Sequence, residues 1–295
     1  MANPEFEAFI APARARPQIW RLIVGLIVAL LIYALTVFGL FFLYWVYFVE
    51  DEAGLDWAEN IVDASDPNSL LLLLSTFIGM ALGPFVAVWL LHKRGPGTLF
   101  GRGAKTLRDF TIAVATVGTI LGVSVFIWSF RYDALPGLGF STWATLLPLA
   151  LLLVLIQTGA EEILFRGYLQ QQLGARFASP LVWLILPAFL FGIVHYDPAS
   201  AGDSAWIVVG SAAFFGLIAG DLTARTGSIG AAWGFHFANN VMALLFISTQ
   251  GTLTGLALYL TPYEVSDAAK LGGLIIYDLA FMVGAWLLLR RILRP

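Results

Sequence analysis

Segment 158–170 places two glutamates and an arginine directly after a long apolar stretch. Glu161 and Glu162 are adjacent, and Arg166 follows Glu162 by four residues. On a helix, Glu162 and Arg166 are neighbours on one face, whereas Glu161 points about 100° around the axis. Arg166 can therefore neutralise one carboxylate and leave the other to face a separate partner. A solvated helix end at the membrane surface would show the same residues, so this segment alone leaves both interpretations open.

Histidines in two other apolar stretches favour a buried acid–base site. His195 and His236 each lie in such a stretch, and Asn240 follows His236 by one helical turn. A lone histidine in an apolar helix is usually a packing residue, but two of them with an asparagine and an acidic pair indicate a shared polar site. His92 lies in a basic loop and is expected to be solvated. Asp278, in the last apolar stretch, is expected to be a hydrogen-bonded structural residue.

A helical hairpin would bring the acidic pair and the first of these histidines to the same depth. If the chain turns at 178–180, residue 178 is 17 residues from both Glu161 and His195. At about 1.5 Å per residue, both then lie roughly 25 Å from the turn. His236 and Asn240 lie about 16 and 22 Å along a third helix. Four polar groups from three helices are therefore predicted to meet near mid-membrane.

The polar residues form three motifs in a fixed order on separate predicted helices: Glu161-Glu162-Ile-Leu-Phe-Arg166, Phe191-Gly-Ile-Val-His195 and His236-Phe-Ala-Asn-Asn240. Together they resemble the signature of the CPBP family of intramembrane proteases. That family includes the CAAX prenyl endopeptidases and bacterial bacteriocin-immunity relatives. The resemblance covers about residues 145–245, and no part of it lies in the first three helices or the last.

The resemblance implies an intramembrane endopeptidase that hydrolyses a peptide bond in a membrane-presented or lipidated substrate. It implies that Glu161 activates a water molecule together with His195. It also implies that His236 and Asn240 form the oxyanion hole for the tetrahedral intermediate.

Glu162 and Arg166 are then supporting residues that orient the site and balance its charge. No cofactor is firmly implied. A divalent metal such as zinc is the open alternative, because glutamate and histidine are acceptable zinc ligands. The chain has no His-Glu-x-x-His sequence, however, so a metal-free glutamate–histidine mechanism is the first choice.

Two functions from other classes compete with a protease. A proton-coupled transporter could use the same glutamates, histidines and arginine as a proton relay. Transporters often contain inverted repeats, and no internal repeat is evident here. A non-catalytic bacteriocin-immunity or scaffolding protein would not need the motif residues. A substitution of Glu161 that left the phenotype intact would therefore favour this alternative over a protease.

The elements that position these residues must lie in a membrane. The chain has 295 residues, of which 59% are hydrophobic and 12% charged, with a mean hydropathy of +0.85. A soluble chain usually carries about twice that charged fraction, so a soluble enzyme and a nucleic-acid binder are excluded. The absence of cysteine excludes disulfides and a cysteine nucleophile.

Long apolar stretches predict an all-α polytopic membrane bundle of about eight transmembrane helices. The stretches are 22–49, 67–91, 110–130, 134–160, 177–196, 204–220, 226–263 with a break near 249–251, and 271–289. With both termini cytoplasmic, only Arg131 and Lys270 of the 16 lysines and arginines lie outside, as the rule for basic cytoplasmic loops requires. The first outer loop is acidic, with Glu50, Asp51, Glu52, Asp56, Glu59, Asp63 and Asp66.

Residues 1–17 are expected to be a mobile or interfacial lead-in, and residues 18–295 a single transmembrane domain with its motif-bearing core at about 145–245. The expected partners are a membrane-associated peptide or protein substrate and the lipid bilayer, with no nucleic acid. The expected location is the bacterial cytoplasmic (inner) membrane. The natural substrate, the cleaved bond, the side of substrate entry and the oligomeric state are not determined by the sequence.

Overall fold

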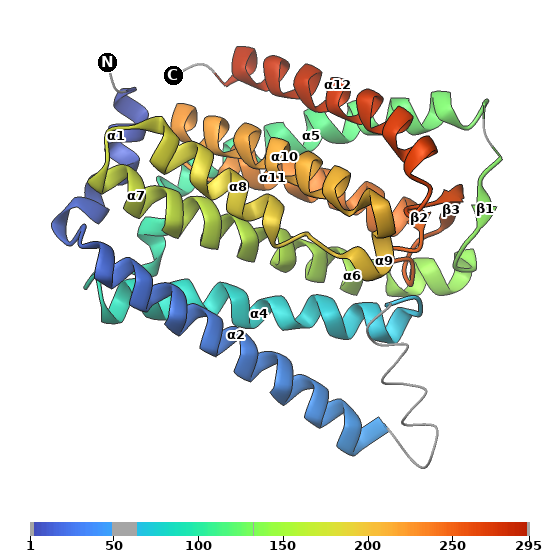
Figure 1. Ribbon diagram of the computed structural model, residues 1–295, viewed down its shortest axis with the longest axis horizontal. Helices are drawn as coiled ribbons and strands as arrows, with labels where there is room; N and C mark the ends of the chain where they lie inside the picture. Colours follow the sequence, from blue (N-terminus) through green and yellow to red (C-terminus); the bar gives the residue numbers. More distant parts are fainter. Residues whose placement is uncertain (1–2, 49–63, 132, 294–295) are drawn as a thin grey trace.

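The computed structural model describes residues 3–48, 64–131 and 133–293, and within them it is a bundle of apolar helices (Figure 1). The helices are α1 (Pro4–Ile10), α2 (Ile19–Phe48), α4 (Pro67–Leu90), α5 (Gly103–Trp128), α6 (Phe140–Glu162), α7 (Gln171–Arg176), α8 (Leu186–Ile193), α9 (Pro198–Ala201), α10 (Ala205–Thr226), α11 (Gly230–Val241) and α12 (Ala268–Ile292). Segments with π-helical geometry cover Ile163–Gln170, Leu181–Ile185 and Met242–Phe246. The all-α polytopic class is confirmed, and the chain is an integral membrane protein.

Six helices in the described residues are long and apolar enough to span a bilayer. They cover Ile19–Tyr47, Pro67–Leu90, Gly103–Trp128, Phe140–Arg176, Pro198–Thr226 and Ala268–Ile292. The fifth expected span is a shorter apolar helix, Leu181–Ile193, and the seventh is α11, whose π-helical extension ends at Phe246. The count of eight and the cytoplasmic placement of both termini therefore stay predictions.

The acidic first outer loop lies mostly outside the described residues. Its last member, Asp66, is described and caps the start of α4, because its side chain accepts from the backbone N–H groups of Asn68 and Ser69. A carboxylate at this position satisfies helix donors that have no partner inside the helix.

The predicted hairpin carries the acidic pair. Phe140–Arg176 is continuous helix, with the π-helical segment between α6 and α7, and the chain reverses before Leu181. Pro180 stands just before the returning helix, a position where its missing N–H costs no helical hydrogen bond. The returning helix ends at Ile193, earlier than the expected 177–196 stretch.

Two glycines let α11 pack closely on α5. A Cβ at Gly230 would lie 2.1 Å from the Thr106 carbonyl oxygen, and one at Gly234 would lie 2.3 Å from that of Phe110. Only a residue without a side chain fits at this distance, as in other close contacts between membrane helices. This packing holds the helix that carries His236 inside the bundle (Figure 1).

A small sheet replaces helix after α11, which the apolar pattern did not predict. It contains β1 (Leu135–Pro136), β2 (Ile247–Gln250) and β3 (Tyr259–Glu264), in the order β1-β3-β2. β3 pairs antiparallel with β1 and parallel with β2. The helix ends at Phe246, before the expected break at 249–251; Thr249 and Gln250 lie in β2, and Gly251 begins a turn at φ +77°. β-branched residues in β2 favour extended backbone there.

The N-terminal segment packs against the bundle and is not a mobile lead-in, while its expected interfacial position stays a prediction. Phe6, Phe9 and Ile10 of α1 are buried in the main core, at exposures of 5%, 3% and 1%. Their spacing gives even this short helix one apolar face, which packs against α7 and α10. The expectation of a mobile segment at residues 1–17 is therefore corrected for residues 3–16.

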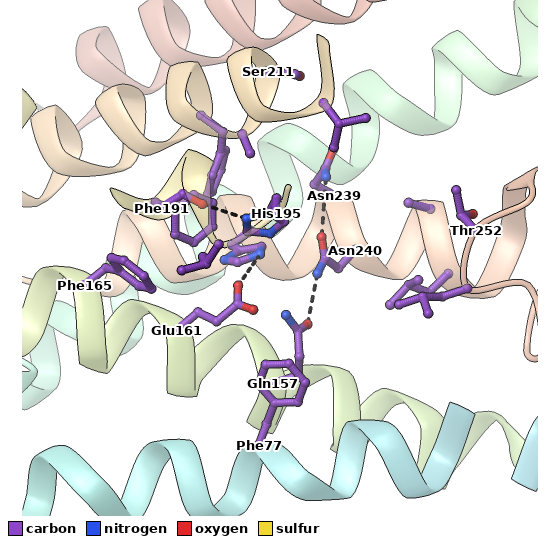
Figure 2. Close-up of a pocket in the computed structure, with 18 of the residues that line it drawn as sticks. Phe77, Gln157, Glu161, Phe165, Phe191, His195, Ser211, Asn239, Asn240 and Thr252 are labelled. Carbon is purple, nitrogen blue, oxygen red and sulfur yellow. Dashed lines mark hydrogen bonds and ion pairs between the residues drawn. The ribbon is translucent and has the colours of Figure 1, made fainter. Parts of the chain in front are cut away.

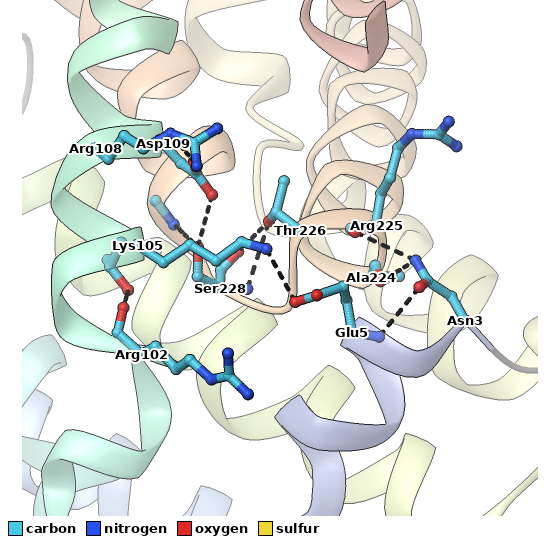
Figure 3. A network of polar contacts seen from close by, with 12 residues as sticks. Asn3, Glu5, Arg102, Lys105, Arg108, Asp109, Ala224, Arg225, Thr226 and Ser228 are labelled. Carbon is cyan, nitrogen blue, oxygen red and sulfur yellow. Dashed lines mark hydrogen bonds and ion pairs between the residues drawn. The ribbon is translucent and has the colours of Figure 1, made fainter. Parts of the chain in front are cut away.

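Polar contacts fasten α1 to two other helices (Figure 3). Asn3 donates to the carbonyl oxygens of Ala224 and Arg225, at 3.1 and 3.2 Å, near the end of α10. Glu5 forms an ion pair of 2.9 Å with Lys105 of α5. The last turn of α10 has carbonyl groups without helical partners, so Asn3 satisfies groups that would otherwise need water.

Candidate active site

Glu162 and Arg166 form a buried ion pair at the start of the π-helical segment. Arg166 Nη1 donates to Glu162 Oε1 over 2.9 Å, and both side chains are at most 1% exposed. Arg166 Nη2 is 3.4 Å from the carbonyl oxygen of Gly216, and the guanidinium lies 4.6 Å from the centre of the Phe191 ring. A buried charge pair is tolerated only with such additional contacts. Arg166 thus neutralises one carboxylate of the acidic pair.

His236 connects the two glutamates. Its Nδ1 atom is 2.9 Å from Glu162 Oε1, and its Nε2 atom is 3.3 Å from Glu161 Oε2. Glu161 is 8% exposed and Glu162 is fully buried. The contact between Glu161 and His236 is close but is not aligned as a hydrogen bond, which leaves Glu161 Oε2 buried with no hydrogen-bond partner among the described residues.

These contacts fix where protons can reside. Glu162 is paired with Arg166 and therefore ionised, so His236 Nδ1 must carry the hydrogen that Glu162 accepts. A bare Nε2 lone pair facing an ionised Glu161 would be repulsive. A proton on either Glu161 or His236 Nε2 would remove this repulsion.

His195 lies in the turn after α8 and not inside a helix. Its Nδ1 atom is 2.7 Å from the carbonyl oxygen of Phe191, a group at the helix end that lacks a helical partner. The carbonyl can only accept, so Nδ1 carries the hydrogen and Nε2 keeps a lone pair. Figure 2 shows His195 beside the same cavity as Glu161.

The amide of Asn240 is held by a residue that the motifs did not identify. Asn240 donates from Nδ2 to Gln157 Oε1 over 2.9 Å. Its Oδ1 atom accepts from the side-chain Nδ2 of Asn239 over 3.5 Å (Figure 2). Gln157 lies four residues before Glu161, hence on the same helix face. That spacing was the available signal for Gln157 in the sequence.

All of these groups except the buried ion pair line one cavity of about 860 Å³. Glu161, His195, His236 and Asn240 come together there, as the hairpin model predicts. Helices outside the motif region also contribute: the wall includes apolar side chains of α2 and α4 and the carboxylate-bearing Asp278 of α12. The sequence contained no signal that assigned these helices to the site.

His92 is buried and not solvated, which corrects the sequence prediction. It is 3% exposed, with Nδ1 3.1 Å from the Arg16 carbonyl oxygen and Nε2 3.0 Å from the Tyr168 hydroxyl. Burial lowers the pKa of His92 to about 4. His92 therefore joins α4 to the N-terminal segment as a neutral group.

The zinc alternative gains no support from the side-chain arrangement. Among the described residues, no group of three or more His, Cys, Asp or Glu side chains is placed to hold a metal ion. Glu162 Oε1 is already shared by Arg166 and His236. We therefore derive no step through a metal.

The site supplies the functions that hydrolysis needs without a serine or cysteine nucleophile. Glu161 offers a buried carboxylate oxygen, His195 an imidazole lone pair, and His236 and Asn240 offer N–H groups, all at one cavity. These are a base for water and donors for a developing negative charge.

Fold and site together define a polytopic membrane protein with an acid–histidine centre inside its helix bundle. Residues 143–242, which hold all three motifs, match the family model of type II CAAX prenyl endopeptidase Rce1-like proteins. The family resemblance is thereby confirmed over these residues. The chain is 29% identical over 255 residues to "Uncharacterized protein YyaK" of Bacillus subtilis (strain 168), with 84% of each chain covered. No solved structure matches the chain significantly.

Proposed function

We propose that this protein is an intramembrane endopeptidase that hydrolyses a peptide bond in a membrane-presented or lipidated substrate. The observation that carries the proposal is Glu161 Oε2, which lies at the cavity wall, buried with no hydrogen-bond partner in the described part of the chain, 3.3 Å from His236 Nε2. Such an oxygen is a ready acceptor for a proton of water. The family match over residues 143–242 supports a peptide bond as the target.

In the proposed mechanism, one proton is shared between Glu161 and His236 Nε2 and serves both halves of the reaction. When it resides on His236 Nε2, Glu161 is ionised and can take a proton from water. The lone pair of His195 Nε2 accepts the other hydrogen of that water and orients it. The hydroxide so formed attacks the carbonyl carbon of the substrate.

His236 and Asn240 then stabilise the tetrahedral intermediate. Negative charge moves to the carbonyl oxygen, and the His236 Nε2–H and Asn240 Nδ2–H groups donate to it. One Asn240 hydrogen is bonded to Gln157, which leaves the second hydrogen for the oxyanion. The C–N bond breaks as Glu161 returns its proton to the departing amine nitrogen, giving a carboxylic acid and an amine, which exchange a proton in water to become a carboxylate and an ammonium.

Apolar side chains of the cavity wall support the proposed substrate class. α2 contributes Leu26, Leu30 and Tyr33, and α4 contributes Phe77 and Met80. An apolar wall of this kind suits an apolar peptide or the hydrocarbon chain of a lipidated one. Both kinds of substrate reach the site from the bilayer. We place the protein in the bacterial cytoplasmic membrane, with the basic loops inside.

Proteomics of protein termini in membrane fractions tests the proposal. Cells producing wild-type protein are compared with cells producing Glu161→Gln or the control Glu264→Gln, which removes an exposed glutamate outside the cavity. We expect new termini in the wild type and the control that are missing in Glu161→Gln. Identical termini in all three would reject the protease and favour the immunity or scaffolding alternative. Loss of cleavage on chelation would revive the zinc alternative.

A further inference from the structure

Asp278 lines the same cavity as Glu161 but lies on a different helix. Ile275, Asp278 and Met282 of α12 all line the cavity. Their spacing of three and four residues puts them on one helix face. Asp278 is the one charged residue between Lys270 and Arg290 in an otherwise apolar helix. A charge placed in this way inside a membrane is costly and marks a functional position.

The other polar groups of α12 that face α10 have partners there. Trp286 Nε1 donates to Asp221 Oδ2 over 2.8 Å, and Arg290 Nε lies 3.4 Å from the same oxygen. Asp278, in contrast, has no hydrogen bond or ion pair within the described part of the chain. The expectation of a hydrogen-bonded structural aspartate is therefore wrong.

The surroundings of Asp278 restrict what can pair with it. Its neighbours on the cavity face are Ile275 and Met282, and α10 adds Val208, Ser211 and Ala212 to the wall, so that the surroundings are mostly apolar and contain no basic residue. A carboxylate in an apolar wall is stabilised by a group that brings a positive charge and hydrogen-bond donors. An ammonium or guanidinium group on an otherwise apolar chain supplies both.

We propose that Asp278 binds a cationic side chain, lysine or arginine, of the substrate and so determines specificity. That the bound molecule is a substrate rests on the proposed function, but its binding can be measured without turnover. Glu161 is the only other acidic residue on the cavity among the described residues, and it already contacts His236. Asp278 is therefore the carboxylate on this cavity that is available to pair with a cation.

Binding of two fluorescent apolar peptides to the purified protein in detergent tests this inference. The peptides are identical except that one has lysine where the other has norleucine, which keeps the chain and removes the charge. We expect wild type, Asp278→Glu and Glu161→Gln to prefer the lysine peptide on the order of tenfold, as one charge-assisted hydrogen bond predicts. Asp278→Asn and Asp278→Ser should bind both peptides equally. The control Asp203→Asn, which removes an exposed aspartate near the start of α12, should keep the preference.

Three results would overturn the inference. They are equal binding of both peptides by wild type, a preference that survives in both neutral Asp278 variants, and a preference lost in Glu161→Gln. The last would put the cation at the acidic pair. The binding pattern could be as expected while no cleavage depends on Glu161. That result would reject the protease and would still support a cation site at Asp278.

Discussion

His92 and His236 are both buried, at 3% and 5% exposure, yet their partners differ in charge. His92 contacts the Tyr168 hydroxyl and a backbone carbonyl, and nearby arginines act with burial to lower its pKa to about 4. His236 lies between Glu161 and Glu162. Burial is therefore common to a structural and a candidate catalytic histidine. The two histidines differ in the charge of their partners, because His92 contacts neutral groups whereas His236 contacts two carboxylates.

Substitution of His236 should reduce turnover, and this is the largest effect expected in the comparison of the two histidines. In His236→Gln, the oxyanion loses a donor and Glu161 loses its proton partner. Turnover of a cleaved peptide should fall by about 10²–10³-fold, the usual effect of removing one oxyanion-hole donor. Kinetic assays of the purified variant check this. Turnover within a few-fold of wild type would remove His236 from the reaction.

Glu162→Gln should act mainly on stability. It leaves Arg166 buried at 1% exposure without a carboxylate, and breaking one partner of a buried pair costs about 3–5 kcal/mol. We expect a lower midpoint of unfolding in detergent. Glu7→Gln, at a partly exposed ion pair with Arg14, is the matched control and should change stability by less than about 1 kcal/mol. Equal stability of the two variants would contradict the buried pair.

His92→Gln should have a smaller effect on stability and none on turnover. The variant weakens contacts with Tyr168 and Arg16, and each lost buried hydrogen bond costs about 1–3 kcal/mol. Thermal unfolding and turnover per folded molecule, measured together, check the separation. A loss of turnover similar to that of His236→Gln would break the comparison between the two histidines.

The contribution of His92 to stability should depend on pH, and near neutral pH this is the smallest of the expected effects. The folded pKa of about 4 lies below the ordinary value of 6.5, so the unfolded state binds more protons between these values. Stability should therefore decrease as the pH falls from 6.5 towards 4, and His92 contributes no such loss above 6.5. Unfolding of wild type and His92→Gln at several pH values checks this. The wild type should lose more stability on acidification, and parallel curves would contradict the prediction.

Local spacing predicted the parts of the site that depend on one helix. The Glu162–Arg166 pair follows from a separation of four residues. The hairpin near residue 178 follows from the position of Pro180 and the lengths of the apolar stretches. The roles of Glu161, His195, His236 and Asn240 stay predictions until turnover is measured.

The hydropathy pattern did not predict contacts between distant segments, and the reason is physical. Hydropathy measures whether a segment can leave water, and in a membrane protein nearly every segment does. It therefore could not separate the short sheet of β1, β2 and β3 from a helix, or buried α1 from a mobile segment. Gln157 was missed because its partner, Asn240, lies on another helix.

The amino-acid sequence by itself determined the membrane location, the helical class and the three groups of polar residues, because charge cost and helical periodicity act along the chain. Only the tertiary structure decided that His236 lies between the two glutamates, that His92 is a buried neutral group and that Asp278 faces the cavity without a partner. These outcomes depend on which helix faces pack together, and that choice is made by side-chain shape and close approach at residues such as Gly230 and Gly234.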